Sequence, residues 1–183
     1  MSRIVSFPPV ENPGARLLVL GSMPGRASLL AGRYYAHPYN QFWPIMGELF
    51  GFDPAADYGL RLQHLRAAGI ALWDVLQSCT RESSLDSDIV EASIVANDFA
   101  GFFQTHRHIR TICFNGGKAE QAFRRHVLRR ENAETWFRAA GLACAAALVK
   151  LPSTSPAHAS RNHVQKLMLW RTALAAGGLA IAQ

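Results

Sequence analysis

The sequence predicts an α/β fold in which a four-stranded, mainly parallel sheet lies between two layers of helices. Four short apolar runs alternate along the chain with longer segments whose apolar residues recur three and four positions apart. A strand buried on both faces reads as a continuous apolar run, whereas a helix that covers it shows the longer period. A three-layer α/β/α sandwich is therefore expected, as one domain over residues 1–183 with an extended, Pro-rich arm at 1–14.

The apolar runs are the predicted strands of this sheet. They occupy residues 15–21, 70–76, 109–115 and 142–151. The polar stretch 77–88 shows no period and is predicted to be an irregular surface loop. Ligands of open α/β sheets bind at the carboxyl ends of the strands, so the residues that follow each run are the first candidates for a site.

Five segments have the spacing of amphipathic helices. They are residues 42–50, 58–68, 89–106, the segment that follows Gly116 and Gly117, and 161–176. Gly51 and Gly69 are placed to end the first two helices. In the fourth, the predicted core residues are Ala119, Ala122, Phe123 and Val127, and in the fifth they are Val164, Leu167, Met168 and Leu174. The Ala-rich tail, 173–182, is predicted to be the end of that helix followed by a frayed end.

Composition narrows the class of function. The net charge of +6 and the pI near 9.7 favour a polyanionic partner. The three cysteines, Cys79, Cys113 and Cys144, are far apart and form no metal-binding spacing, so no zinc or iron–sulfur site and a reducing, cytoplasmic location are expected. No signal peptide and no run long enough to cross a membrane are evident. We expect a monomer without a cofactor.

The stretch 20–43 is the richest in residues that could bind a ligand. It leaves the first apolar run as the loop Gly21-Ser22-Met23-Pro24-Gly25 and ends in a cluster of aromatic and polar residues. The cluster contains Tyr34, Tyr35, His37, Pro38, Asn40, Phe42 and Trp43. Such a set suits a flat ring with polar edges, such as a nucleobase. The same pattern is also typical of a loop beside a small aromatic core.

Three motifs in this sequence resemble those of the uracil-DNA glycosylase superfamily, especially its hypoxanthine-DNA and mismatch-specific uracil glycosylase branches. GSMPG at 21–25 resembles the catalytic loop, and HPYNQFW at 37–43 resembles the segment that follows it. LPSTSPA at 151–157 resembles the loop that those enzymes press into the minor groove of DNA. The resemblance implies a monofunctional DNA glycosylase that flips deaminated bases, hypoxanthine or uracil, out of DNA for base excision repair.

One position departs from the superfamily pattern. Relatives carry Asn or Asp at or near the position of Met23 to orient the attacking water, and a thioether cannot do this. The hypoxanthine-type branch uses the Asn of the segment that follows, which corresponds to Asn40. The resemblance therefore implies that Asn40 orients water, while the backbone N–H groups of Ser22 and Met23 stabilise the departing base. From the residues alone, Asn40 could equally pin its own loop.

The resemblance also implies which residues bind the base and the DNA. Tyr35 corresponds to the aromatic residue that stacks on the flipped base, and Gly21 lies beside it at the strand end. Asp74 ends the second predicted strand, where a carboxylate could read the base or brace a loop. The residues expected to brace the catalytic loop are Pro24, Gly25, His37 and Phe42. The residues expected to contact DNA are Ser153, Thr154, Ser155, His158, Arg161 and Lys118.

Three alternatives remain open at this stage. The chain could act on uracil or thymine opposite guanine, or it could bind nucleic acid with weak or no catalysis, because the usual water-orienting residue is missing. An unrelated α/β hydrolase is a further reading, but the chain lacks the G-x-S-x-G elbow. The arginines between 124 and 130 are interpreted as a solvated helix face.

Overall fold

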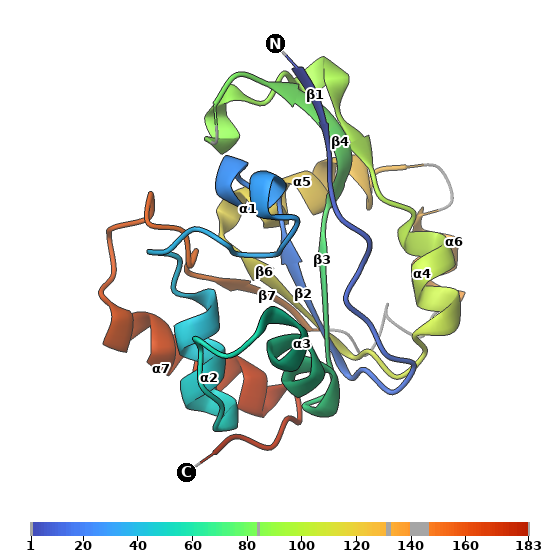
Figure 1. Cartoon of the computed structure of the whole chain (residues 1–183). Helices are drawn as coiled ribbons and strands as arrows, with labels where there is room; N and C mark the ends of the chain where they lie inside the picture. Colours follow the sequence, from blue (N-terminus) through green and yellow to red (C-terminus); the bar gives the residue numbers. More distant parts are fainter. Residues whose placement is uncertain (1, 84, 131–132, 140–146, 183) are drawn as a thin grey trace.

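A computed structural model describes residues 2–83, 85–130, 133–139 and 147–182. Its main sheet has the strands β2 (Leu17–Gly21), β3 (Ile70–Asp74), β6 (Thr111–Asn115) and β7 (Ala147–Leu151). They are all parallel, in the order β3-β2-β6-β7 (Figure 1). The predicted four-stranded sheet is confirmed. The predicted start of the last strand, 142–146, lies outside the described residues.

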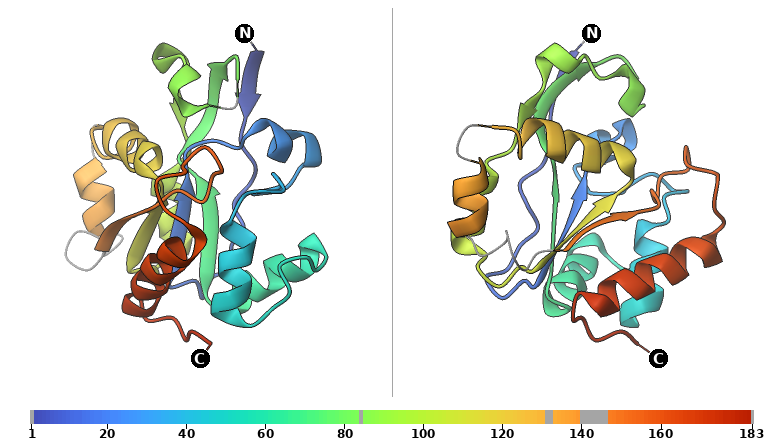
Figure 2. Two further views of the ribbon diagram at one scale, coloured as in Figure 1. Left: turned by 90° about the vertical axis from the view of Figure 1, so that its left-hand side faces the viewer. Right: turned by 180° about the vertical axis from the view of Figure 1, so that it is seen from behind.

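Helices cover both faces of the sheet, so the predicted three-layer sandwich is confirmed as well (Figure 2). Helices α2 (Phe42–Phe50), α3 (Tyr58–Ala67) and α7 (His163–Ala176) pack on one face, and α4 (Phe99–Thr105), α5 (Gly117–His126) and α6 (Ala133–Ala139) pack on the other. A short helix, α1 (Arg26–Ala31), follows β2.

The strand residues alternate between two hydrophobic cores because successive side chains of a strand point to opposite faces. Leu17 and Val19 of β2 pack with α2, α3 and α7, whereas Leu18 and Leu20 pack with α4 and α5. All four leucine and valine side chains are fully buried. This burial on both sides explains why the strand has no polar alternation in its sequence.

A second, antiparallel sheet was not predicted. It has the order β1-β4-β5 and contains β1 (Ser2–Val5), β4 (Leu76–Arg81) and β5 (Val95–Ala96). The predicted irregular loop at 77–88 is therefore wrong over its first part, where β4 pairs with the amino-terminal arm. The polar composition of β4 hides its strand character, because its pairing partner lies more than seventy residues away in the sequence.

Two helix predictions need correction. Residues 89–106 do not form one helix, since a 3₁₀ turn at Glu91–Ser93 and strand β5 come before α4. Helix α4 begins only after Asp98, whose carboxylate accepts a hydrogen bond from the Gly101 amide at 3.0 Å. A cap of this kind fixes where a helix starts.

The inward face of α7 was predicted only in part. Leu174 is buried and Leu167 is partly buried, as predicted, but Val164 and Met168 are 61% and 63% exposed, and the other buried side chains are Lys166, Trp170 and Ala173. The tail is not frayed over its described length. Leu179 is buried, and the Ala182 amide donates to the Leu49 carbonyl at 2.8 Å.

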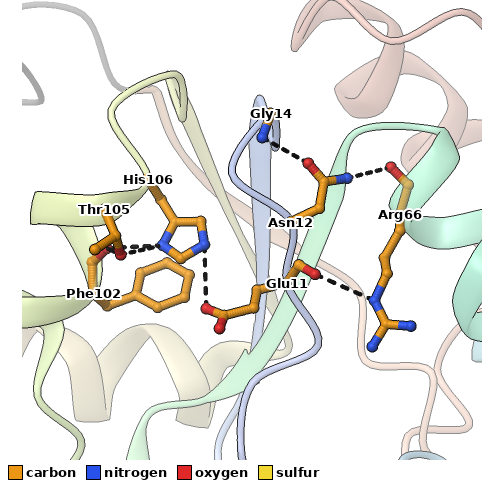
Figure 3. A network of polar contacts seen from close by, with 7 residues as sticks. All are labelled: Glu11, Asn12, Gly14, Arg66, Phe102, Thr105 and His106. Atoms are coloured by element: carbon orange, nitrogen blue, oxygen red, sulfur yellow. Dashed lines mark hydrogen bonds and ion pairs between the residues drawn. The ribbon is translucent and has the colours of Figure 1, made fainter.

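A polar network fixes the amino-terminal segment across the amino ends of the strands (Figure 3). Glu11 accepts from His106 at 3.2 Å through its carboxylate and from Arg66 at 3.2 Å through its backbone carbonyl. Asn12 donates to the Arg66 carbonyl at 2.5 Å. Since Arg66 and His106 precede β3 and β6, this edge of the sheet is closed and the opposite, carboxyl edge is left for a ligand. Within the described ranges, no helix has both the length and the hydropathy to span a membrane.

Candidate active site

A pocket of about 500 Å³ lies at the carboxyl edge of the main sheet, within the size range of ligand sites. The loops that follow β2, β6 and β7 contribute to its wall, together with Asp74 at the end of β3 and with Leu85 and Ser87 after β4. The chain passes from β2 to β3 on one side and then crosses to β6 on the other side, so the strand order reverses between β2 and β6. Open α/β sheets place their ligands at such a reversal.

Most of the residues predicted for the site come together in this pocket. Those that line it are Gly21, Ser22, Met23, Pro24, Gly25, Tyr35, His37, Asn40, Asp74, Lys118, Ser153, Thr154, Ser155 and His158. Phe42 lies fully buried behind Tyr35. Arg161 lines an adjacent hollow of about 450 Å³, together with Lys150 and Ser160. The two hollows share Gly116, Gly117, Ser153 and His158.

The floor of the pocket combines a buried carboxylate with a tyrosine hydroxyl. Asp74 is 4% exposed, and Asn97 holds its backbone carbonyl at 2.8 Å. A Cβ atom at Gly21 would lie 2.5 Å from Asp74 Oδ1 and 3.5 Å from the Tyr35 hydroxyl. Glycine at the end of β2 is therefore required by the close approach of these two side chains, rather than by its backbone angles.

Tyr35 is held in an uncommon backbone conformation, with a φ of 54°. Left-handed conformations are rare for bulky residues and cluster at functional sites. One face of its half-buried ring stacks on Phe42, with centroids 4.1 Å apart. Burial, with the negative charge of Asp74 as the second cause, raises the pKa of the Tyr35 hydroxyl. The hydroxyl is therefore neutral at physiological pH and can donate a hydrogen bond.

The segment after Tyr35 is a compact turn that begins α2. The backbone N–H of Asn40 donates to the His37 carbonyl at 2.9 Å. The side-chain oxygen of Asn40, Oδ1, accepts from the backbone N–H of Phe42 at 3.0 Å. His37 Nδ1 accepts from the Tyr39 amide at 3.2 Å. Asn40 thus holds the start of α2 while it lines the pocket. An amide oxygen has two lone pairs, so this bond leaves one for a water molecule.

Asn115, at the end of β6, joins the two halves of the site and had no predicted role. Its side chain donates to Thr154 Oγ1 at 2.9 Å and accepts from the Thr154 amide at 2.8 Å. The Thr154 carbonyl in turn accepts from the Gln41 amide at 3.0 Å. Thr154 is completely buried. The prediction that its hydroxyl contacts a phosphate is therefore wrong, because that hydroxyl fixes the loop after β7 to the segment before α2.

We expect Thr154→Val to destabilise the protein. The substitution keeps the shape of the side chain but leaves the half-buried Asn115 side-chain amide without its acceptor, which costs roughly 1–3 kcal/mol in the free energy of unfolding. Chemical denaturation of the wild type, Thr154→Val and Thr154→Ser measures this cost, and the serine variant should retain most of the stability. Weaker DNA binding without any loss of stability would restore the phosphate-contact assignment.

The loop after β2 is supported from below by a buried arginine that sequence reasoning missed. Arg81 of β4 is 4% exposed, and its Nη2 donates to the Pro24 carbonyl. Ser28, also buried, accepts from the Ala36 amide at 3.2 Å and ties α1 to the Tyr35 turn. Asn115 ends a predicted strand just as Asp74 does, so the same rule could have identified it. Arg81 carried no such signal, since it lay in a predicted loop.

The residues at the mouth of the pocket differ in their environments. Lys118 lies 3.9 Å from the Glu91 carboxylate. The Ser153 hydroxyl accepts a hydrogen bond from the backbone N–H of Ser155, and the Ser155 hydroxyl accepts one from that of Ala157. These two bonds shape the turn. Met23 is 7% exposed and packs into a hydrophobic core. Its side chain adds no polar group to the pocket, so only its backbone could serve the chemistry.

The part of the chain that the structure describes shows neither a metal site nor a reactive thiol near the pocket. Over the described residues, no group of three or more His, Cys, Asp or Glu side chains could hold a metal ion. Burial raises the pKa of the Cys113 thiol to about 12, so this cysteine is inert. Cys144 lies outside the described residues. Besides carboxylate, amide, hydroxyl and backbone groups, the polar groups that line the pocket include the imidazoles of His37 and His158 and the Lys118 ammonium.

Comparison with known proteins identifies the class to which this fold and pocket belong. The family model of the uracil DNA glycosylase superfamily matches residues 8–175. The chain belongs to this superfamily and is a DNA glycosylase. It is 36% identical over 114 residues to a protein of Methanosarcina barkeri named hypoxanthine DNA glycosylase, and 39% identical over 114 residues to a protein of the same name from Methanosarcina acetivorans. Each match covers 62% of this chain and 71% of the relative.

A solved structure extends the similarity over nearly the whole chain. A Methanosarcina acetivorans protein, described as a candidate uracil DNA glycosylase and solved by solution NMR, is 31% identical to this chain with a TM-score of 0.70. The match covers 93% of this chain and 98% of that protein. The chain thus shares its three-layer fold with this relative.

Proposed function

We propose that this DNA glycosylase excises deaminated bases from DNA, with hypoxanthine as the main substrate, and leaves the sugar–phosphate backbone intact. The observation that carries the proposal is the buried carboxylate of Asp74 on the pocket floor, next to the Tyr35 hydroxyl. The names of the two Methanosarcina relatives support hypoxanthine as the base. Base excision repair begins with this reaction.

The proposed basis of base choice is the hydrogen-bonding pattern of the ring. An ionised carboxylate only accepts hydrogen bonds. Hypoxanthine at N1 and uracil at N3 present N–H donors, whereas adenine at N1 and cytosine at N3 present lone pairs. Asp74 would therefore favour deaminated bases over their normal parents. The neutral Tyr35 hydroxyl adds a donor that could meet a carbonyl oxygen, which deamination introduces into both bases.

The proposed reaction needs positioning and electrostatics rather than a cofactor. The base leaves the stack, at a cost of a few kcal/mol, and stacks on Tyr35. Negative charge grows on the departing base, and the backbone N–H groups of Ser22 and Met23 would stabilise that charge more than they stabilise the bound substrate. Asn40 would orient the attacking water through its second lone pair. Gly21 leaves room for the base edge against Asp74.

DNA binding is proposed to use the rim of the pocket and the adjacent hollow. Ser153 and Ser155 offer hydroxyl donors to phosphates, and His158 and Lys118 lie along the same rim. Arg161 extends this surface into the second hollow. Because phosphate contacts supply most of the affinity for DNA, DNA binding should weaken as the salt concentration rises, whatever the base sequence of the duplex.

Two other functions are each favoured by a particular observation. Uracil, or thymine opposite guanine, offers the same ring N–H to Asp74, so these bases compete as substrates. A protein that binds DNA with little catalysis is favoured by Met23, since its buried thioether stands where relatives orient water.

A panel of duplexes that carry hypoxanthine, uracil, xanthine or thymine opposite each normal base tests the proposal. We expect abasic sites to form fastest at hypoxanthine, equally well with a metal chelator present, and strand breaks to appear only after alkali or heat. Faster excision of uracil would move the assignment to that base. Tight DNA binding with no excision of any base would favour the non-catalytic alternative.

A further inference from the structure

Two hydrogen bonds from one helix hold the two ends of the loop after β7. The indole Nε1 of Trp170 donates to the Pro152 carbonyl at 3.2 Å, at the start of the loop. The Lys166 ammonium donates to the His158 carbonyl at 2.9 Å, at its end. Both donors belong to α7, which the loop itself leads into (Figure 2). The five residues between the two carbonyls, Ser153 to Ala157, all line the pocket.

The spacing of the two donors makes this arrangement rigid. Lys166 and Trp170 are four residues apart, so they project from one face of the helix, one turn above the other. A capping box begins α7, with Asn162 and Gln165 bonded to each other's backbone amides at 2.9 and 3.1 Å. The helix is thus fixed at its first turn, directly before Lys166.

Lys166 is an unusual residue for this position. Its side chain is 2% exposed, whereas neighbouring inward residues of α7 are apolar. Burial of an ammonium group is costly unless it is well bonded, and desolvation lowers the pKa of Lys166. A leucine or methionine would fill the same space without that cost. The bond to the loop carbonyl is therefore the feature that an apolar residue could not supply.

The part of the loop nearest to Lys166 has few other restraints. The backbone amides of Ala157 and His158 donate to Ser155, and the His158 ring bonds to the Ser160 hydroxyl, all within the segment between β7 and α7. Thr154, by contrast, is fixed to Asn115 from the other side. Lys166 therefore joins the tip at 156–158 directly to a regular element, helix α7.

We propose that Lys166 and Trp170 are positioning residues that hold the DNA-facing loop 152–158 in its binding geometry. The proposal rests on the assignment of that loop to DNA binding. Lys166 holds the tip of the loop at the His158 carbonyl, and Trp170 holds the start of the loop at the Pro152 carbonyl. Neither residue lines the pocket, so both act through the backbone of the loop rather than through contact with substrate.

The test compares Lys166→Met with a matched variant of the same helix. Arg171 also donates from α7 to a backbone carbonyl, that of Ala182 at 3.0 Å, but in the tail away from the loop. We expect Lys166→Met to weaken duplex binding roughly tenfold, as the loss of a charged hydrogen bond implies, and to speed hydrogen exchange at the Ala157 and His158 amides. Arg171→Met should change neither. The melting temperature of Lys166→Met should equal or exceed that of the wild type.

The melting temperature separates positioning from a purely structural role. If Lys166 only stabilised the fold, Lys166→Met would lower the melting temperature and lose binding in proportion, which would overturn the proposal. Wild-type affinity together with wild-type exchange in the loop would also overturn it. Trp170→Phe, which keeps the ring edge-on to Phe42 but removes the N–H, should speed exchange near Ser153. If binding weakens as expected but no hypoxanthine is excised by the wild type, the loop assignment stands and the proposed substrate fails.

Discussion

The Asn40→Ala variant is expected to lose excision while it keeps DNA binding. If Asn40 orients the attacking water, its truncation removes a positioned catalytic group, and such losses slow the chemical step by about 10²–10³-fold. Tyr35 and the phosphate-binding loop are unchanged in this variant, so duplex affinity should stay within about twofold of the wild type, since they supply the stacking and backbone contacts. Single-turnover rates and equilibrium binding measure the two effects separately.

Stability decides between this role and the loop-pinning alternative. Asn40 Oδ1 accepts from the Phe42 amide, so Asn40→Ala also removes a bond at the start of α2, worth about 0.5–2 kcal/mol by analogy with helix caps. Asn40→Asp keeps that acceptor and serves as the matched control. The catalytic assignment would be contradicted if the loss of rate disappears after correction for the fraction of unfolded protein. It would also be contradicted if a stable Asn40→Ala variant cleaves at the wild-type rate.

The second large effect concerns Asp74 and the choice of base. Asp74→Asn keeps an oxygen acceptor and adds an N–H donor, which could bond to the ring lone pair of adenine or cytosine. A mismatched buried polar group costs roughly 1–3 kcal/mol, so discrimination against the normal bases should relax by about one to two powers of ten. Asp74→Ala should slow excision of deaminated bases without creating activity on normal ones.

The measurement is the ratio of single-turnover rates for hypoxanthine over adenine, and for uracil over cytosine, in all three proteins. The Asn97 side chain donates to the backbone carbonyl of Asp74 and not to the Asp74 side chain. This bond should therefore hold the end of β3 in place in each variant. Unchanged ratios in a folded Asp74→Asn protein would place base choice in the backbone of the Ser22–Met23 loop instead.

The layered fold could be predicted because its signals are local. Four strands were visible as apolar runs, since β2, β3 and β6 are buried on both faces and β7 is partly buried. Helix α2 was predicted with its exact limits, as Gly51 in the left-handed conformation ends it. The small sheet could not be predicted, because β1 and β4 are short, polar and far apart in the sequence. The face of α7 was misjudged because a buried lysine contradicts the hydrophobic pattern that the prediction relies on.

The site was predictable to the extent that it follows the strand ends. Gly21 and Asp74 end two neighbouring strands, and the parallel sheet brings them together. Asn115 also ends a strand, so the same rule applies to it. Arg81 and Lys166 were not predictable in this way, because they act through bonds to the loop carbonyls of Pro24 and His158, and a polar residue gives no local sign of such a partner. Thr154 was misassigned for the same reason, since its hydroxyl looks available until its burial is known.

The most direct test of the account is the identity of the small molecule released from DNA. A duplex with a single deoxyinosine is incubated with an excess of the protein, and the free bases in solution are identified by mass spectrometry. The account predicts stoichiometric release of hypoxanthine from an otherwise unbroken strand, with none in Asn40→Ala over the same time. Release of no base, or release of hypoxanthine still attached to deoxyribose, would contradict it.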